Sequence, residues 1–453
     1  MLTSSRFSLR QMLFGLSLIL IALLDPIGLA SSTDEASSRW LNRLLANWYA
    51  DAGQRQVVVV LIDDEYLQQN DTFWPLPYAE QSRLFKRLLA YQPGAVFIDL
   101  LYSHDHSQAT PGQAPRVQSQ ALANVFERYW QQGIPLIVAN TGVERGAQGG
   151  VNTLPSLAQV STPALVSWSG FGSQYPLAVN TDLGAMETPA LVMYRQYCHL
   201  HGCPELPADA QAAALRPPMA VQWGVHQSPL QAQVSDISDC KVPGLLDQLL
   251  QALFWKLGSN AQANCAYNLT LNARDLEVTD PDEQALLRQL LQGKQVLVGA
   301  RIAGTGDVTQ SPLHGKVPGV YLHAMALDNL INWGMGYYRA TPSLPGSVSV
   351  DVLDVIELAL LGLLTYLKGT LDAPLLAGNG RHARLRLRPL TAWALVVVLL
   401  GSLSAGLWLN NFTPANVLGL LLLSMTLFSQ RIQAAIESDV PGRSIFSSQG
   451  TQR

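Results

Sequence analysis

The chain has 453 residues, of which 48% are hydrophobic and only 14% are charged. Soluble domains carry about 25% charged residues, so this composition indicates that part of the chain lies in a membrane. The net charge of −4 provides no basic field, and this excludes nucleic acid as a partner.

The first apolar segment follows a basic N-terminus and covers residues 12–30. A cleavable signal peptide is one interpretation, but Asp25 and Pro26 interrupt the region where cleavage would occur. We therefore favour an uncleaved transmembrane helix that continues into a folded domain.

Three further apolar segments lie in the last quarter of the chain, and a spanning helix needs about 20 residues. Lysine and arginine gather before the first helix, between the second and third, and after the fourth, which places these parts in the cytoplasm. This pattern predicts a multi-pass protein of the bacterial inner membrane. The expected order is a cytoplasmic N-terminus (1–11), a first helix (12–30), a periplasmic domain (31–345), a second helix (348–367), a basic cytoplasmic loop (368–389), a third helix (390–409), a periplasmic turn (410–413), a fourth helix (414–430) and a cytoplasmic tail (431–453).

Three acidic residues mark the start of the second predicted membrane helix. Asp351, Asp354 and Glu357 recur every three residues and therefore share one helix face. Charges are costly in lipid, so these first turns either stand at the outer interface or form a polar seam against another helix. In the second interpretation the three acids are candidates for coupling the membrane helices to a partner.

Strand-like and helix-like segments alternate between the membrane segments. Apolar runs predict strands at Val57–Ile62, Ala95–Ile98, Pro135–Ala139, Met219–Trp223 and Gln295–Val298. Helical periodicity predicts helices at Tyr78–Tyr91, Val117–Gln132, Pro189–Leu200, Leu245–Trp255, Pro281–Gln292 and Val317–Trp333. The alternation predicts an α/β fold, with a mostly parallel sheet covered by helices, in addition to the four transmembrane helices.

Four cysteines fall in the segment that we place in the periplasm. An even number in an oxidising compartment indicates two disulfides, and three pairings are open. We favour Cys198–Cys203 and Cys240–Cys265, because each closes a local loop. The stretch 198–203 also contains two histidines and has the composition of a zinc site. The oxidising compartment favours the disulfide, and we expect neither a metal nor a cofactor.

Carboxylates follow three of the predicted strands. Asp63 and Asp64 come after the first strand, Asp99 ends the second, and Asp307 lies in a glycine-rich loop after the strand Gln295–Val298. Ligands of open α/β sheets bind where parallel strands end, so these acids are candidates for a small-ligand or cation site. The alternative is that each caps a helix or fixes a turn.

Two blocks of sequence carry a resemblance to a known family. The first block combines the run Val-Val-Val-Val-Leu-Ile-Asp-Asp within residues 57–67, the turn Trp-Pro-Leu-Pro at 74–77 and a strand ending in Asp at 94–99. The second block combines a strand with Gly-Ala at 294–300, Gly-Asp at 306–307, Ser-Pro at 311–312 and Pro-Gly-Val-Tyr-Leu-His-Ala at 318–324. Together they resemble the type-2 CHASE domain, an extracytoplasmic sensory domain, over about residues 38–335. Leu76 stands where the family has a second tryptophan, and Ser311 where it has threonine.

The resemblance adds two candidates for the ligand site. Trp74, held extended before a proline, would fold its ring over the strand end near Asp63. His323 would face the same side, where it could titrate near neutral pH or stay packed and hydrogen-bonded, which we favour. The family joins such domains to cyclases, kinases or cyclic-di-GMP enzymes, but the expected cytoplasmic tail is too short for a folded domain.

These observations predict a sensory or regulatory protein rather than an enzyme, since the chain lacks the Gly-x-Ser-x-Gly and His-Glu-x-x-His patterns. It would sense a small periplasmic ligand and signal through its helices to a separate cytoplasmic or membrane protein. The alternative is a structural or assembly subunit of an envelope complex. Neither hypothesis decides whether the chain forms a homodimer.

Overall fold

The structure is a computed structural model, and the chain forms two compact units. Residues 40–340 form one, here called the α/β unit, and residues 1–39 with 341–453 form the other, the helical unit. The structure describes residues 13, 15–20, 28–103, 118–143, 153–169, 174–234, 266–342, 344, 351–371 and 389–428.

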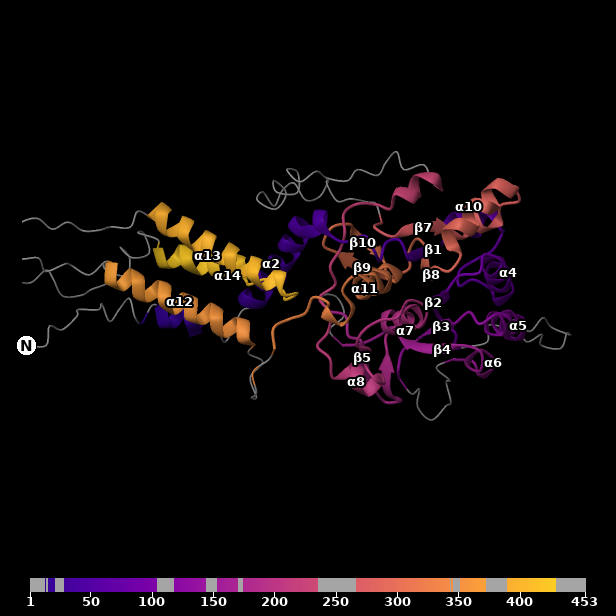
Figure 1. Cartoon of the computed structure of the whole chain (residues 1–453), viewed down its shortest axis with the longest axis horizontal. Coiled ribbons are helices and arrows are strands. Elements are labelled where there is room, and N and C mark those ends of the chain that lie inside the picture. The colour runs from indigo at the N-terminus through magenta and orange to yellow at the C-terminus, as the bar shows by residue number, and fades with distance from the viewer. Residues whose placement is uncertain are drawn as a thin grey trace, which may run out of the picture. The chain divides into compact units, whose positions relative to one another are not determined.

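The α/β unit is built on a six-stranded sheet in which every pair of neighbouring strands is parallel (Figure 1). The strand order is β4-β3-β2-β8-β1-β7. The strands are β1 (Val57–Asp63), β2 (Ala95–Leu101), β3 (Leu136–Asn140), β4 (Thr162–Leu165), β7 (Leu269–Asn272) and β8 (Gln295–Arg301). The predicted parallel sheet is therefore confirmed.

The central strands are apolar on both faces, as a sheet covered on both sides requires. In β1 the side chains of Val57, Val59 and Leu61 join one hydrophobic cluster, and those of Val58 and Val60 join the other. This alternation follows from the two-residue period of a strand. A continuous run of branched side chains thus serves two separate cores.

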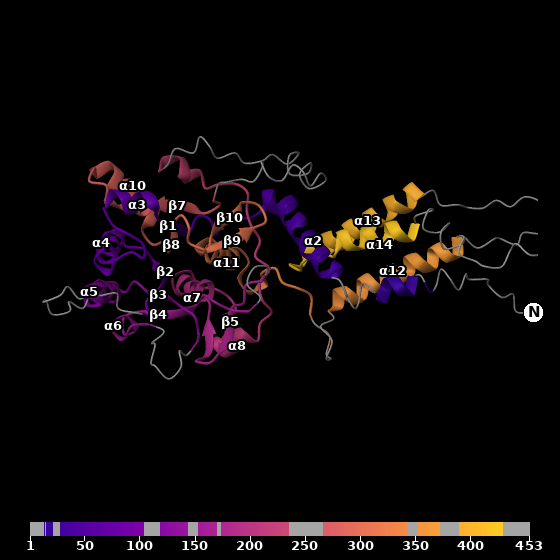
Figure 2. The same cartoon turned by 180° about the vertical axis from the view of Figure 1, so that it is seen from behind.

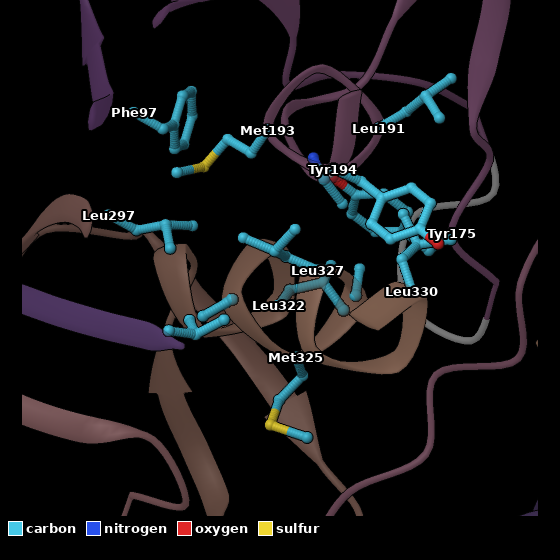
Figure 3. Close-up of a cluster of buried hydrophobic side chains, with 14 of the residues drawn as sticks. Phe97, Tyr175, Leu191, Met193, Tyr194, Leu297, Leu322, Met325, Leu327 and Leu330 are labelled. Carbon is cyan, nitrogen blue, oxygen red and sulfur yellow. Dashed lines mark hydrogen bonds between the residues drawn. The ribbon is translucent and has the colours of Figure 1, made fainter. Parts of the chain in front are cut away.

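Helices cover both faces of the sheet, and the two opposite views agree on this layering (Figures 1 and 2). One face packs against α7 (Pro189–His201) and α11 (Val320–Trp333), the other against α4 (Tyr78–Leu89), α5 (Gln118–Gln131) and α10 (Pro281–Leu291). On the first face, side chains of α7 and α11 point toward one another, with Phe97 and Leu297 from the sheet beside them (Figure 3).

Shorter elements complete the unit. Two antiparallel pairs are β5 (Ala178–Thr181) with β6 (Gly184–Glu187), and β9 (Val308–Ser311) with β10 (Gly315–Pro318). The remaining elements are η1 (Ala46–Trp48), α3 (Asp64–Gln69), α6 (Pro155–Ala158), α8 (Ala210–Ala214), η2 (Pro229–Gln233), η4 (Ala273–Glu277) and η5 (Gly334–Gly336). A side chain closes the edge strand β7: the Gln231 amide accepts from Thr270 N and donates to Thr270 O, both at 2.7 Å. This leaves fewer free backbone groups for edge pairing.

One predicted strand is wrong, and one predicted helix is confirmed with a later start. The strand expected at Met219–Trp223 does not form, because its amides bond to scattered partners: Met219 to the Tyr175 carbonyl and Ala220 to the Tyr338 carbonyl. The helix expected from Val317 begins at Val320, since the preceding residues belong to β10. The predicted helix at 245–255 lies outside the described residues.

The helical unit contains α12 (Val352–Leu371), α13 (Pro389–Leu409) and α14 (Val417–Phe428), together with the first part of α2 (Leu29–Leu45). Small apolar clusters join α12, α13 and α14. Among the described residues, no helix combines the length and the apolar character needed to cross a membrane.

Candidate functional site

The carboxyl edge of the sheet is where the structure gathers most of the predicted ligand residues. Asp63 ends β1, Asp99 lies near the end of β2, and Asp307 follows β8 in the loop to β9. Pairing between β2 and β8 stops at Ile98, and the register between β2 and β3 shifts between Ile98 and Leu101. Such irregularities re-aim side chains and are frequent beside functional sites, and this one falls on Asp99.

The first two acids are occupied by local structure. Asp63 is buried; its Oδ1 accepts the Tyr66 amide at 2.9 Å as the N-cap of α3, and its Oδ2 faces Arg301 at 3.3 Å. Asp64 Oδ2 accepts the Ala303 amide at 3.0 Å. Asp63 thus has the helix-capping role that we expected as the alternative, whereas Asp64 holds the loop after β8. A role of either residue in ligand binding stays a prediction.

Asp99 and Asp307 differ from this pair because neither carboxylate has a counter-charge among the residues that the structure describes. Within the described residues, the Asp99 carboxylate accepts no hydrogen bond. Burial, with the nearby charge of Asp307 adding to it, raises the pKa of Asp99 to about 8. Burial also raises the pKa of Asp307. An uncompensated pair of this kind favours a ligand that presents positive charge or hydrogen-bond donors.

Close packing holds the Asp307 loop against the start of α11. A Cβ on Gly319 would lie 2.3 Å from Asp307 Oδ1, and one on Gly299 would lie 2.5 Å from Val320 Cβ. The Gly319 amide also donates to the Asp307 carbonyl at 3.2 Å. Glycine at both positions therefore lets β8 and its loop approach the helix directly.

His323 lies on the first buried turns of α11 and is 3% exposed. Its Nδ1 is 2.8 Å from the Tyr175 hydroxyl, and the rings of Phe97, Trp168 and Tyr175 contact it edge-on at centroid distances of 5.4, 6.2 and 5.6 Å. Burial lowers the pKa of His323 to about 3. The packed, hydrogen-bonded histidine that we favoured is confirmed, and this residue stays neutral near pH 7.

Tyr175 connects His323 to the start of α7. Its hydroxyl accepts the Ala190 amide at 3.2 Å and shares a hydrogen bond with His323 Nδ1 at 2.8 Å. Burial raises the pKa of Tyr175, and the charge of Asp99 adds to this effect. His323, Tyr175 and Asp99 therefore belong to one neighbourhood.

Trp74 does not join this group. It packs against the cluster formed with α4, α5 and α10, whereas His323 packs on the opposite face of the sheet. The expectation that the two residues share one side is therefore wrong. The sheet separates them, because alternate residues of each strand point to opposite faces.

The disulfide between Cys198 and Cys203 is confirmed, with an S–S distance of 2.06 Å at the C-terminal end of α7. Its formation rules out a metal site that uses these two thiols. The second predicted pair, Cys240 and Cys265, lies outside the described residues. The described part of the chain contains no group of three or more metal-ligating side chains.

The three acids of the predicted seam lie in the helical unit. Asp351 and Asp354 cap α12 reciprocally, since each backbone amide donates to the other carboxylate at 2.8 to 2.9 Å. Glu357 Oε1 accepts the amide of Asn416 at 2.6 Å, directly before α14. Glu357 therefore meets another helix of its own chain, and a coupling role for the three acids stays a prediction.

Several residues of the site were not predicted. Tyr175 and Trp168 lie in a stretch without clear periodicity, and no sequence signal marks them. Asp328 and Asn329 are each 0% exposed in α11, and here a signal existed, because a carboxylate inside an apolar helical run is unusual.

A model of the CHASE2 domain matches residues 15–367 of the chain. The chain belongs to this family. The CHASE2 domain is an extracytoplasmic sensory domain, so the resemblance drawn from the sequence is confirmed. Comparison with curated proteins and with solved structures found no match.

Proposed function

We propose that this CHASE2 protein is a membrane-bound sensor, not an enzyme, that detects a small ligand outside the cytoplasm. One N-terminal and three C-terminal helices would anchor it in the bacterial inner membrane, with the α/β unit in the periplasm. Its signal would pass through these helices to a separate signalling protein. The family match carries the sensory role, and the distribution of lysine and arginine supports the orientation.

The ligand site of this proposal is the carboxyl edge around Asp99, Asp307 and His323. In the described part of the chain the two acids have no counter-charge, and the aromatic rings around His323 provide an apolar wall next to them. Such a combination suits a small cation, because aromatic faces also attract positive charge. A ligand acts as a signal only by binding two conformations with different affinity.

Topology is the first experiment. A reporter inserted at the exposed Glu205 should be active only outside the cytoplasm, and a reporter fused after Arg453 only inside it. If both report the same compartment, the proposed arrangement is wrong. Cross-linking and co-purification of the full chain then identify the partner: a signalling enzyme supports the proposal, and a stable stoichiometric envelope complex supports a structural role instead.

Ligand chemistry is tested with two probes, methylammonium and Mg²⁺, on the purified full chain in detergent. The melting temperature should rise with one of them in the wild type and not in Asp99→Asn. Asp209→Asn is the matched control, since Asp209 is an exposed helix cap elsewhere in the unit. If neither cation stabilises the wild type, the cation site is refuted.

A further inference from the structure

The second cluster of buried polar residues in the α/β unit lies on the C-terminal half of α11. Asp328 is 0% exposed and accepts three hydrogen bonds: from the Tyr49 hydroxyl at 2.7 Å, Asn332 Nδ2 at 2.8 Å and Asn268 Nδ2 at 3.0 Å. Asn329 Nδ2 in turn donates to the Tyr49 hydroxyl at 2.8 Å. A buried carboxyl group with this many partners fixes the elements that supply them.

One of these partners, Tyr49, belongs to the first residues of the unit. Tyr49 follows η1, and Asn332 donates to the Ala50 carbonyl at 3.1 Å and accepts the Gly53 amide at 3.2 Å. Gly53 packs so tightly that a Cβ there would lie 2.5 Å from Asp328 Cγ. The chain that leads into the unit is thus held along one side of its last helix.

The last residues of the unit meet at the same place. The ring of Trp333, at the end of α11, contacts Tyr49 edge-on at 5.2 Å and Tyr338 at 5.0 Å. Gln222 completes the connection: it receives a hydrogen bond from Asn42 at 3.0 Å, and its backbone is held by Asn329 on both sides. The two ends of the α/β unit are therefore joined through α11.

We propose that Asp328 and Tyr49 form a proton-controlled clasp: protonated Asp328 holds residues 42–53 against α11, and ionisation of Asp328 opens this contact. The proton leaves the carboxyl group for solvent water when the pH rises and returns from it when the pH falls. The clasp needs no ligand at the carboxyl edge, so it goes beyond the proposed function.

The direction of the pH effect on the clasp follows from the difference in the pKa of Asp328 between the closed and open forms. Burial raises the pKa of Asp328 to about 8, although its three hydrogen bonds lower it. Opening would expose the carboxyl group to water and return its pKa toward the ordinary 3.8. The closed form therefore binds the proton more tightly than the open form, and raising the pH through about 8 favours opening.

The side-chain amide of Asn268 can accept a hydrogen bond from protonated Asp328 after rotation. Asn268 donates to Asp328 Oδ2, while its own Oδ1 is buried and has no hydrogen-bond partner among the described residues. Turning this amide end for end would present the oxygen to Asp328, as a protonated carboxyl group requires. The site therefore accommodates either form of Asp328 by a side-chain rotation.

Within the described ranges, three titratable groups interact with Asp328: Tyr49, Asp51 and Tyr267. The turn before β1 brings Asp51, whose charge adds to the raised pKa of Asp328 and which pairs with Arg55 at 2.7 Å. Burial raises the pKa of both Tyr49 and Tyr267, so these hydroxyls stay neutral. Toward β1, β8 and α7 the helix packs through apolar side chains. The other ionisable side chains on the helix itself are Tyr321 and His323. Elements packed against α11 carry Asp63 paired with Arg301 at the ends of β1 and β8, Arg195 (paired with Glu187), Tyr194, Tyr197, His199 and His201 on α7, and His314 and Lys316 at β10.

Hydrogen exchange of the full chain in detergent tests the clasp. Exchange is followed by mass spectrometry on peptides that cover residues 42–56 and corrected for intrinsic rates. The pKa of Asp328 is about 8 in the closed form and returns toward 3.8 in the open form. The equilibrium constant for opening should therefore rise about a hundredfold between about pH 6 and pH 9. Asp328→Asn should remove this rise and leave the segment protected at both values. Asp209→Asn, which removes an exposed helix cap elsewhere in the unit, should keep it.

Each outcome decides the proposal. A wild type whose exchange does not rise with pH, or an Asp328→Asn protein that responds as the wild type does, overturns it. If Asp328→Asn does not fold, infrared titration of the Asp99→Asn protein replaces it, because Asp99 also has a pKa raised to about 8 and would give the same band. The protonated carboxyl band that remains must disappear over the same pH range in which exchange rises. Tyr49→Phe, which removes only the hydroxyl, should raise exchange of residues 42–56 already at about pH 6. Failure of the clasp leaves the ligand and topology tests of the proposed function unaffected.

Discussion

Removing one hydroxyl group from Tyr175 tests how the core supports the candidate site. In Tyr175→Phe the ring stays and its packing with Trp168 and His323 is kept. Two buried groups lose their partner: His323 Nδ1 and the Ala190 amide. Each unpaired buried group costs about 1–3 kcal/mol, so we expect the free energy of unfolding to fall by about 2–4 kcal/mol. A loss of this size is a large fraction of the stability of an ordinary domain.

The assay is urea unfolding of the full chain in detergent, followed by far-ultraviolet circular dichroism. Tyr197→Phe is the matched control on the same side of the unit, because the Tyr197 hydroxyl makes no hydrogen bond in the described part of the chain. It should change stability by less than about 0.5 kcal/mol. Combining Tyr175→Phe with His323→Phe should cost less than the sum of the two single changes, since the residues share one hydrogen bond. A loss below about 0.5 kcal/mol in Tyr175→Phe, or strict additivity, would refute the assigned bond.

Three further outcomes follow from the same packing. The raised pKa of Asp99 makes the folded protein keep a proton that the unfolded chain releases above pH 3.8, so the free energy of unfolding falls as the pH rises toward about 8. In Asp99→Asn the decrease of this free energy with pH should be smaller by up to about 1.4 kcal/mol per pH unit, as measured by unfolding across this range. Leu327→Ala should lower the free energy of unfolding by about 2–5 kcal/mol, because Leu327 is fully buried, whereas Leu200→Ala, at a residue 67% exposed, should leave it nearly unchanged. Gly299→Ala should cost about 1–3 kcal/mol by overpacking, visible as a lower melting temperature, and a neutral result would contradict the close approach of β8 to α11.

The sequence predicted the main strands because their signal is local. Runs such as Val57–Ile62 are apolar on both faces, and this pattern is typical of a strand buried between two helical layers. Strand order is a different matter, since β8 lies between β2 and β1 through contacts distant in sequence. The four-residue strand β7 was missed because so short a segment carries little periodicity.

The candidate site was predicted in part, and for a physical reason. Parallel strands end at one edge, so acids placed after strands converge whatever the strand order. What the sequence could not supply is which carboxylates find partners: Asp63 meets the distant Arg301, whereas Asp99 lies at a shift in register and meets none among the described residues. The sequence also could not predict on which face of the sheet Trp74 lies, because Trp74 is not part of a strand.

The helix α11 carries residues of both the candidate site and the proposed clasp. Every residue from Val320 to Leu330 is buried, so the helix touches the sheet on one side and α7 on the other along its length. His323 and Asp328 are five residues apart, about 7.5 Å along the axis of a helix. A packed helix moves as a rigid body, because close-packed interiors do not deform continuously. We therefore expect a displacement imposed near Gly319 to reach the hydrogen bonds of Asp328, and this would appear as a change in hydrogen exchange of residues 42–56.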